Sequence, residues 1–308
     1  MSIGAIRVDP QLPSRGVGGP VAAAGTNLIG AVAVLARDRG GLLGMIVVSS
    51  LVIAAILAPL LVPYDPLAVS ADLSLGRPSL AHPFGTDDLG RDVLARVLIG
   101  ARISLGVSSL SAFGALAVAV PLGMLAGYVG GAVDAVIARL FDTILAFPAV
   151  LLGIGMVALL GSGIANVVIA VIVISVPTLG RLARVAVISQ RREEYIEAAR
   201  AAGSTATRVL VRHIFPNAAP ALIVQTTLVM ADAVLLEAAF SFLGLGSRPP
   251  TPSWGTMLDS GRTFLNQAPW LGLFPGLAMT LTILGLNALG DALREALNPR
   301  RRMTGRPA

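Results

Sequence analysis

The side chains that could do chemistry are few in this sequence, and they are widely separated. The 308 residues include no cysteine, and all 23 basic residues are arginine. The chain therefore has no thiolate nucleophile, no cysteine-bound zinc site, no Schiff-base lysine and no P-loop lysine to hold a nucleotide phosphate. The two histidines, His82 and His213, lie far apart in the sequence. We expect no catalytic centre, no bound metal and no cofactor on this chain.

Charged residues gather densely in one short segment that precedes a long apolar stretch. The segment contains Asp87, Asp88, Arg91, Asp92 and Arg96. One interpretation is a salt-bridged cap that orders the segment, although exposed ion pairs contribute at most about 1 kcal/mol each. Another is a charged surface that steers a partner protein. The two interpretations are compatible, and the residue types alone leave both open.

Composition predicts that the elements carrying these residues are membrane helices. Hydrophobic residues make up 55% of the chain and charged residues 13%, against about 25% charged in soluble domains. A spanning helix needs about 20 apolar residues, and stretches without charge cover residues 40–64, 103–133, 143–180, 217–231 (extended to about 243) and 263–290. The third stretch is too long for one helix, and Gly161 and Gly163 predict a hairpin turn that divides it. The expected fold is an all-α integral membrane protein with six transmembrane helices.

The distribution of arginine predicts the orientation of these helices. Cytoplasmic segments of membrane proteins carry an excess of positive charge, and most of the arginines fall on one side when both termini are cytoplasmic. The net charge of +6 is then a topology signal, so we expect a lipid bilayer and no nucleic acid as partner. The predicted division is a cytoplasmic tail with an interfacial segment at 1–39, a first transmembrane helix at 40–64, an extracytoplasmic loop at 65–98, a transmembrane core at 99–295 and a cytoplasmic tail at 296–308.

Two acidic residues, Asp232 and Glu237, lie within or beside the fifth predicted span. An ionised carboxylate is costly in lipid, so both side chains should face protein or water. Either residue could line a path through the membrane. A satisfied polar contact inside the helix bundle is the simpler alternative.

The longest predicted cytoplasmic loop covers residues 181–216 and has the pattern of two helices joined by a turn. Strong helix formers run over 181–202, and Gly203 is placed to end that helix. Ser204 and Thr205 can cap a second helix that runs toward Arg212. Pro216 stands at the start of the next span, where its missing N–H costs little.

The same loop resembles the EAA loop of binding-protein-dependent ABC importer permeases. Glu197-Ala198-Ala199 is followed by Gly203 and then by Ile214-Phe215-Pro216, with Phe215 where leucine is commoner. In that family the loop docks on an ATPase subunit and passes its movement to the membrane helices. The resemblance implies that the coupling residues are Glu197, Ala198, Ala199, Gly203, Ile214 and Pro216. An ordinary amphipathic surface loop is the alternative.

Three further segments resemble the C-type permease subunit of peptide and nickel importers. Residues 82–92 read HPFGTDDLGRD, residues 237–255 read EAAFSFLGLGSRPPTPSWG, and residues 286–300 read LNALGDALREALNPR. The departures from the family pattern are mild: Ala95 replaces serine, Phe240 replaces leucine, and Glu295 and Asn298 differ in the last segment. The motifs occur in the expected order, and the resemblance covers about residues 35–302.

The resemblance implies a type I ABC importer permease in a bacterial plasma membrane, with ATP and Mg²⁺ bound by partner chains. The implied partners are a B-type permease subunit, two ATPase subunits and an extracytoplasmic solute-binding protein. The implied substrates are dipeptides or oligopeptides, and nickel and glutathione stay open because importers of those solutes share the signature. The outer residues Asp87, Asp88, Arg91 and Asp92 are then candidates for contact with the binding protein, and Asp232 and Glu237 for the translocation path.

Rival interpretations belong to other classes of protein. A secondary transporter driven by an ion gradient would need ionisable residues at mid-membrane, and Asp232 is the candidate. A membrane-embedded enzyme would need a clustered catalytic constellation, for which the sequence offers little. A passive channel or scaffold would be distinguished by transport that does not depend on ATP.

Overall fold

The computed structural model describes residues 39–297 and forms no strand in that range, so the all-α expectation is confirmed. The predicted tail before residue 39, with its interfacial segment, and the tail from residue 298 lie outside the described residues. The described elements are α2 (Arg39–Leu61), the short 3₁₀ helix η1 (Ala71–Leu73), α3 (Val93–Val129), α4 (Gly131–Leu145), α5 (Ala149–Leu160), α6 (Ile164–Gln190), α7 (Glu194–Ala201), α8 (Ala206–Val209), the π-helical turn η2 (Leu210–Ile214), α9 (Phe215–Phe242), α10 (Trp254–Thr263) and α11 (Trp270–Ala296).

Five helical segments between residues 39 and 297 are long and apolar enough to cross a membrane: α2, α3, α6, the continuous run from α8 to α9, and α11. A sixth span exists only if α4 and α5 are counted together, and these two helices are bent by 94°. The charge-free stretch that predicted the third span starts at residue 143, whereas the structure divides this region into α4 and α5. Pro148 has no N–H and disfavours helical backbone at Phe147, so α4 ends at Leu145 and α5 begins after the proline.

The predicted turn between the third and fourth spans is confirmed. Gly161 and Gly163 have φ angles of +94° and +148°, which residues with a side chain rarely adopt. The N–H of Gly163 donates to the Leu245 carbonyl at 3.0 Å. The turn is therefore tied to the loop that follows α9.

Helix α3 begins at Val93, well before the charge-free stretch that starts at residue 103. The helix can include charge here because Arg96 is only 6% exposed and its Nε lies 3.4 Å from the Asp87 carboxylate. Asp92 caps the helix, since its Oδ1 accepts the Ala95 N–H at 2.7 Å. A search for charge-free stretches therefore places the start of this helix too late.

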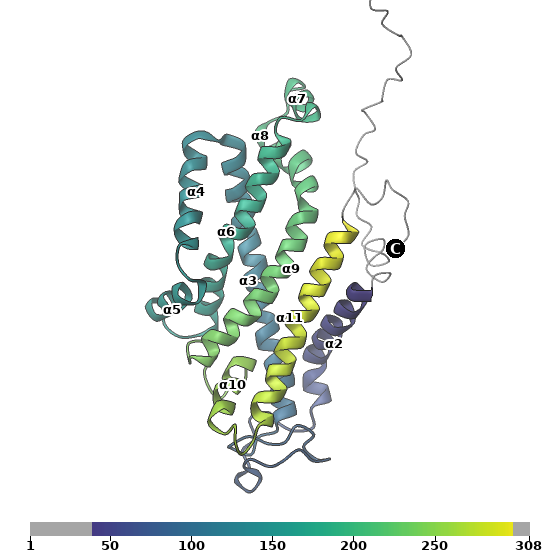
Figure 1. The fold of residues 1–308 in the computed structure, drawn as a ribbon, viewed down its shortest axis with the longest axis vertical. Coiled ribbons are helices and arrows are strands. Elements are labelled where there is room, and N and C mark those ends of the chain that lie inside the picture. The colour runs from purple at the N-terminus through teal and green to yellow at the C-terminus, as the bar shows by residue number, and fades with distance from the viewer. Residues whose placement is uncertain (1–38, 298–308) are drawn as a thin grey trace, which may run out of the picture.

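Helices α3, α6 and α9 form the centre of the bundle, with α2 and α11 side by side on one flank and α4 and α5 on the other (Figure 1). Helices α3 and α6 pack closely because a Cβ on Gly123 would lie 2.1 Å from the Gly180 carbonyl oxygen. The loop after α2 and helix α10 lie at one end of the bundle, and α7 and α8 lie at the other (Figure 1).

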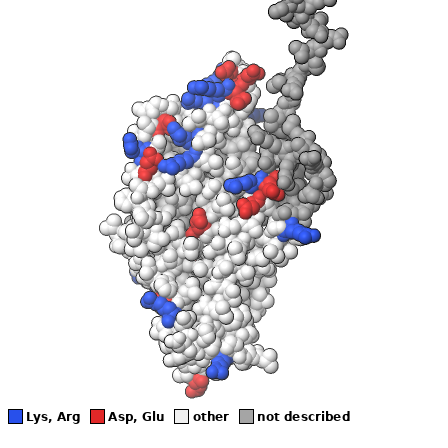
Figure 2. All heavy atoms as spheres, in the orientation of Figure 1, with Lys and Arg blue, Asp and Glu red and all other residues white. Residues whose placement is uncertain are grey.

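The charged side chains are unevenly distributed along the bundle. Figure 2 shows that, on the face in view, blue and red spheres gather in the half that carries α7, whereas the other half is mostly white. This is the half that the arginine distribution predicted to be cytoplasmic.

Candidate functional site

The turn after α7 is a Schellman motif built around Gly203. The N–H of Gly203 donates to the Arg200 carbonyl at 2.9 Å, and the N–H of Ser204 donates to the Ala199 carbonyl at 3.0 Å. Gly203 has a φ of +82°, the left-handed conformation that this motif requires after the last helical residue. The predicted helix end at Gly203 is confirmed, whereas the helix itself is shorter than predicted. Helix α6 ends at Gln190, and α7 starts only at Glu194.

The second half of the loop is continuous with the next span. Thr205 is the N-cap of α8, and its hydroxyl accepts the Arg208 N–H at 3.4 Å. The chain then passes through the π-helical turn Leu210–Ile214 directly into α9. Pro216 lacks an N–H, and its ring would crowd the carbonyl of Arg212 in a regular α-helix, so a wider π turn relieves that clash. Helix α8 is thereby joined to α9 without an intervening loop.

Apolar side chains anchor the loop on the helices beneath it. Ile196, Val209 and Ile214 are fully buried, and they pack with Val187 of α6 and Met124 of α3. The predicted coupling residue Ile214 is therefore part of this internal cluster. The loop rests on the ends of α3, α6 and α9 together.

Two arginines add polar anchors between the loop region and the end of α3. The Arg200 guanidinium lies 5.1 Å from the centroid of the Tyr128 ring, a cation–π distance. The Nη1 of Arg191 donates to the Gly127 carbonyl at 3.1 Å. Arg200 therefore ties α7 to the end of α3, and Arg191 ties the segment between α6 and α7 to the same place.

The outer face of α7 and its turn is exposed and, apart from Glu197, consists of small residues. Glu197, Ala198 and Gly203 are exposed, and Ala199 is half-buried. A Cβ on Gly203 would meet no atom within 4 Å. We call this face the α7 surface and define it by Glu197, Ala198, Ala201, Ala202 and Gly203, all of which are exposed. Such a surface allows the backbone of a partner to approach closely. Pro216, the last predicted coupling residue, is exposed in the first turn of α9.

At the opposite end, the predicted charge cluster is mostly internal. Asp87 is 5% exposed, and its Oδ1 accepts the backbone N–H groups of Leu89 and Arg91, each at 2.9 Å. Its Oδ2 accepts the Arg91 Nε–H at 2.7 Å and lies 3.4 Å from Arg96 Nε. The carboxylate therefore orders the loop around itself, as the salt-bridged cap predicted.

Asp92 is also buried, and it links the loop to His82. The His82 Nδ1 lies 2.8 Å from Asp92 Oδ2, and the His82 ring packs on Tyr64 with 4.7 Å between centroids. Asp88 is half-buried, and its Oδ1 lies 3.8 Å from Arg91 Nη2. Of the four residues predicted to contact a binding protein, Asp88 is therefore the most accessible.

Glu237 is sealed inside the bundle and joins three helices. It is 2% exposed, and it accepts the hydroxyl protons of Ser104 at 2.8 Å and Ser241 at 2.7 Å. The backbone N–H of Trp254 in α10 donates to the same Ser104 hydroxyl at 3.4 Å. The structure thus places Glu237 in a satisfied internal cluster, which is the simpler of the two interpretations of this residue.

Asp232 lies on a different face of α9 and is exposed. Within residues 39–297, no hydrogen bond or ion pair reaches its carboxylate. Gln225 lies two helical turns away on the same face, and Ala221 and Asn217 continue that line toward the end of the helix. The structure therefore brings Asp232 together with a polar stripe and separates it from Glu237.

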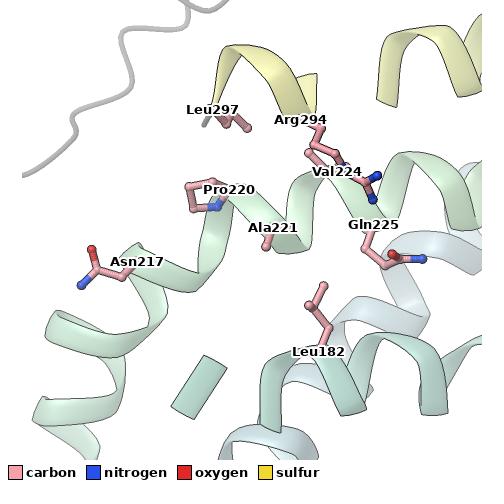
Figure 3. Close-up of a pocket in the computed structure, with 8 residues that line it drawn as sticks. All are labelled: Leu182, Asn217, Pro220, Ala221, Val224, Gln225, Arg294 and Leu297. Atoms are coloured by element: carbon pink, nitrogen blue, oxygen red, sulfur yellow. The ribbon is translucent and has the colours of Figure 1, made fainter. Parts of the chain in front are cut away.

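The stripe ends in a pocket of about 370 Å³ between α6, α9 and α11. The lining residues are Leu182, Asn217, Pro220, Ala221, Val224, Gln225, Arg294 and Leu297. Figure 3 shows Asn217 toward one end of the pocket and Gln225 and Arg294 toward the other. The sequence analysis did not identify Asn217 and Gln225. The sequence feature that could have identified them is two amide side chains on one face of a mostly apolar helix.

Comparison with known proteins identifies the family to which this chain belongs. A model described as the binding-protein-dependent transport system inner membrane component matches residues 119–303, and a model of the N-terminal TM domain of oligopeptide transport permease C matches residues 29–81. The chain belongs to the family of binding-protein-dependent transport system inner membrane components. It is a multi-pass permease subunit of an ABC importer in a bacterial inner membrane.

Curated relatives of the permease cover most of both chains. It is 45% identical to the dipeptide transport system permease protein DppC of Alkalihalophilus pseudofirmus, over 86% of this chain and 88% of that protein. It is 41% identical to the di/tripeptide transport system permease protein DppC of Pseudomonas aeruginosa, over 86% and 89%. It is 43% identical to the glutathione transport system permease protein GsiD of Shigella dysenteriae, over 86% and 88%.

A solved structure shows the same fold. The match is to the MetNI methionine ABC transporter in an inward-facing conformation, with a TM-score of 0.53 and 19% sequence identity. It covers 67% of the permease and 98% of the matched chain. At this identity the match establishes the type I importer fold alone.

Proposed function

We propose that this permease moves dipeptides or oligopeptides across the membrane while separate ATPase subunits, which bind ATP and Mg²⁺, supply the energy. The single observation that carries the proposal is the α7 surface, which is exposed and small yet anchored on three membrane helices. Relatives named as dipeptide and di/tripeptide permeases support the substrate class.

The coupling residues act in two groups in this proposal. Glu197, Ala198 and Gly203 contact a groove on an ATPase subunit, and Ala199 supports the turn through its carbonyl. Ile214 and Pro216 connect that contact to α9, because the π-helical turn joins α8 and α9 without a loop. When the two ATPase subunits close on ATP, each α7 moves with them and the attached helices tilt.

The translocation path follows the stripe on α9 in this proposal. Asn217, Ala221, Gln225 and Asp232 face a second, B-type permease subunit across the path, and the pocket beside Arg294 is its cytoplasmic end. Amide and carboxylate side chains suit a peptide, which offers backbone hydrogen-bonding groups and a terminal ammonium. Glu237 supports the path only indirectly, since it is enclosed by α3, α9 and α10.

An extracytoplasmic solute-binding protein docks at the other end of the bundle and selects the solute. Asp88, with the exposed Leu89 beside it, is the accessible part of the predicted contact. Asp87, Arg91 and Asp92 hold the shape of that surface through their internal ion pairs. Glutathione is the second candidate substrate, because a glutathione permease is 43% identical to this chain.

The first experiment measures whether the α7 surface couples ATP hydrolysis to transport. The permease is reconstituted in proteoliposomes with its neighbouring permease and ATPase chains, and hydrolysis is measured with binding protein and a peptide mixture. We expect Gly203→Asp to reduce stimulated hydrolysis about tenfold, because it places a charge on the docking surface. A tenfold change corresponds to about 1.4 kcal/mol.

Gly203→Asn is the matched control, since asparagine has the same size and also tolerates the left-handed conformation. We expect it to retain most of the stimulated hydrolysis and the same thermal stability as Gly203→Asp. If both variants hydrolyse ATP normally with bound subunits, the α7 surface is not the coupling element. If peptide accumulates without ATP, the protein is an ion-coupled or passive transporter and Asp232 becomes the residue to test.

A further inference from the structure

Arg102 is a charged residue within the membrane helix α3 that the proposed function does not use. Its side chain is exposed, and no hydrogen bond or ion pair reaches it from the rest of residues 39–297. A guanidinium cannot lose its charge at physiological pH, and leaving it unpaired in hydrocarbon is unfavourable. Arg96 is six residues earlier in the same helix, and it differs from Arg102 because it is buried beside Asp87. Arg102 therefore needs a partner from outside the described part of this chain.

Arg102 lines a cleft between α2 and α3. The cleft has a volume of about 290 Å³ and is lined by Val52, Ala55, Ile56, Arg102, Leu105, Gly106 and Ser109. A Cβ on Gly106 would meet no atom within 4 Å, so the space beside this residue is open. Ile56, which also lines the cleft, is 65% exposed. The cleft is thus a mainly apolar trough with one cation, Arg102, and one hydroxyl side chain, Ser109.

The cleft lies in the outer half of the membrane in the predicted orientation. Val52 and Ile56 are about 7–14 Å from Leu61 along the axis of α2, at about 1.5 Å per residue. Leu61 ends the span at the same end of the bundle as the outer loop (Figure 1). A long arginine side chain at this depth can extend toward the headgroup level while its stem stays in the apolar layer.

We propose that this cleft binds an anionic phospholipid of the outer leaflet, with the Arg102 guanidinium on its phosphodiester. The planar guanidinium donates two parallel hydrogen bonds to two phosphate oxygens. The apolar walls formed by Val52, Ile56 and Leu105 accommodate an acyl chain of the same molecule. A zwitterionic lipid carries its own ammonium group, which competes for the phosphate, so phosphatidylglycerol should bind more tightly than phosphatidylethanolamine.

A carboxylate from a second permease subunit is the competing partner for Arg102. A carboxylate would satisfy the charge but would leave the apolar trough beside Gly106 empty. A phospholipid satisfies both features at once, because it joins an anion to a hydrocarbon chain. Binding of a phospholipid in this cleft does not depend on which solute the permease transports.

The test measures lipid retained by the full-length permease and the chains that copurify with it. The complex is purified in mild detergent, and native mass spectrometry counts bound phosphatidylglycerol and phosphatidylethanolamine as each is added. We expect Arg102→Gln to weaken phosphatidylglycerol binding about tenfold. Gly106→Leu keeps the charge and fills the cleft, so it should displace the lipid as well. Arg262→Gln is the control, since Arg262 is an exposed arginine already paired with Asp259 at 2.9 Å.

A second measurement tests lipid binding at the same cleft if the Arg102→Gln variant fails to assemble. A photo-crosslinking amino acid at Val52, activated in intact membranes, should capture phospholipid in the wild-type protein and lose that product in Gly106→Leu. Capture of another protein chain at this position would overturn the proposal and make Arg102 an interface residue. Equal phosphatidylglycerol binding by wild type, Arg102→Gln and Gly106→Leu would overturn it as well.

Discussion

At the scale of single residues, burial decides which acids are available for transport. Asp232 and Glu237 are close in sequence and lie on the same helix, yet Glu237 is 2% exposed and Asp232 is exposed. Glu237 accepts two serine hydroxyls inside the bundle, whereas Asp232 faces away from it. We therefore expect the two residues to affect different properties of the permease.

Replacing Glu237 should destabilise the fold. Glu237→Ala removes the acceptor of two buried hydroxyls, and we expect a cost of about 2–4 kcal/mol in the free energy of unfolding. Glu237→Gln keeps one acceptor and should cost less. Thermal unfolding of the purified variants measures which of the two loses more stability. An unchanged stability of Glu237→Ala would show that the cluster does not stabilise the fold.

Replacing Asp232 should impair transport without affecting stability. The Asp232→Asn side chain has the same shape and stays exposed, so the free energy of unfolding should match that of wild type within about 0.5 kcal/mol. Peptide uptake into proteoliposomes should fall about five- to tenfold if the carboxylate meets the peptide ammonium. Uptake at the wild-type rate would show that the Asp232 carboxylate does not contact the peptide in the translocation path.

At the scale of elements, close packing of glycines sets the distance between α3 and α6. The Gly123 Cα faces the backbone of Gly180, and this contact positions α6, the helix that leads into α7. The same helix packs on α9 through the cluster that contains Val187 and Leu222. The packing of α3 on α6 therefore supports the coupling loop from below.

Gly123→Ala should destabilise this packing. The new methyl would lie 2.1 Å from the Gly180 carbonyl oxygen, so one of the two helices has to shift. We expect a loss of about 1–3 kcal/mol and a lower yield of assembled complex. Gly155→Ala in α5 is the matched control, because its methyl meets nothing within 4 Å. Equal stability of the two variants would contradict the role of close packing.

At the scale of the whole molecule, the two ends with proposed functions lie at opposite ends of the bundle. The α7 surface lies at one end, and the loop ordered by Asp87 lies at the other (Figure 1). A transporter that couples an ATPase inside to a binding protein outside needs this separation. The orientation of the two ends relative to the cell is the feature that the arginine distribution predicts.

Single-cysteine labelling tests this orientation directly, because the natural chain contains no cysteine. Leu80 and Ala198 are exposed at the two ends. We expect Leu80→Cys to react with a membrane-impermeant maleimide in cells whose outer membrane has been opened. Ala198→Cys should react only after the inner membrane is permeabilised. The reverse pattern would place the α7 surface outside and contradict the ATPase-coupling proposal.

Local composition and turn chemistry were enough to predict several features of this fold. Long apolar stretches predicted the membrane helices, Gly161 and Gly163 predicted a turn, and Gly203 predicted the end of α7. These predictions succeeded because the length of an apolar stretch and a left-handed glycine each determine the local backbone without help from distant residues. Motifs spread along the chain also led to the family, which the comparisons confirm.

The tertiary structure decided the features that depend on residues far apart in the sequence. The early start of α3 rests on Asp87 beside Arg96, and the enclosure of Glu237 rests on Ser104. Sequence alone could not assign these features, because the free energy of a charge in a membrane protein depends on its partners in space.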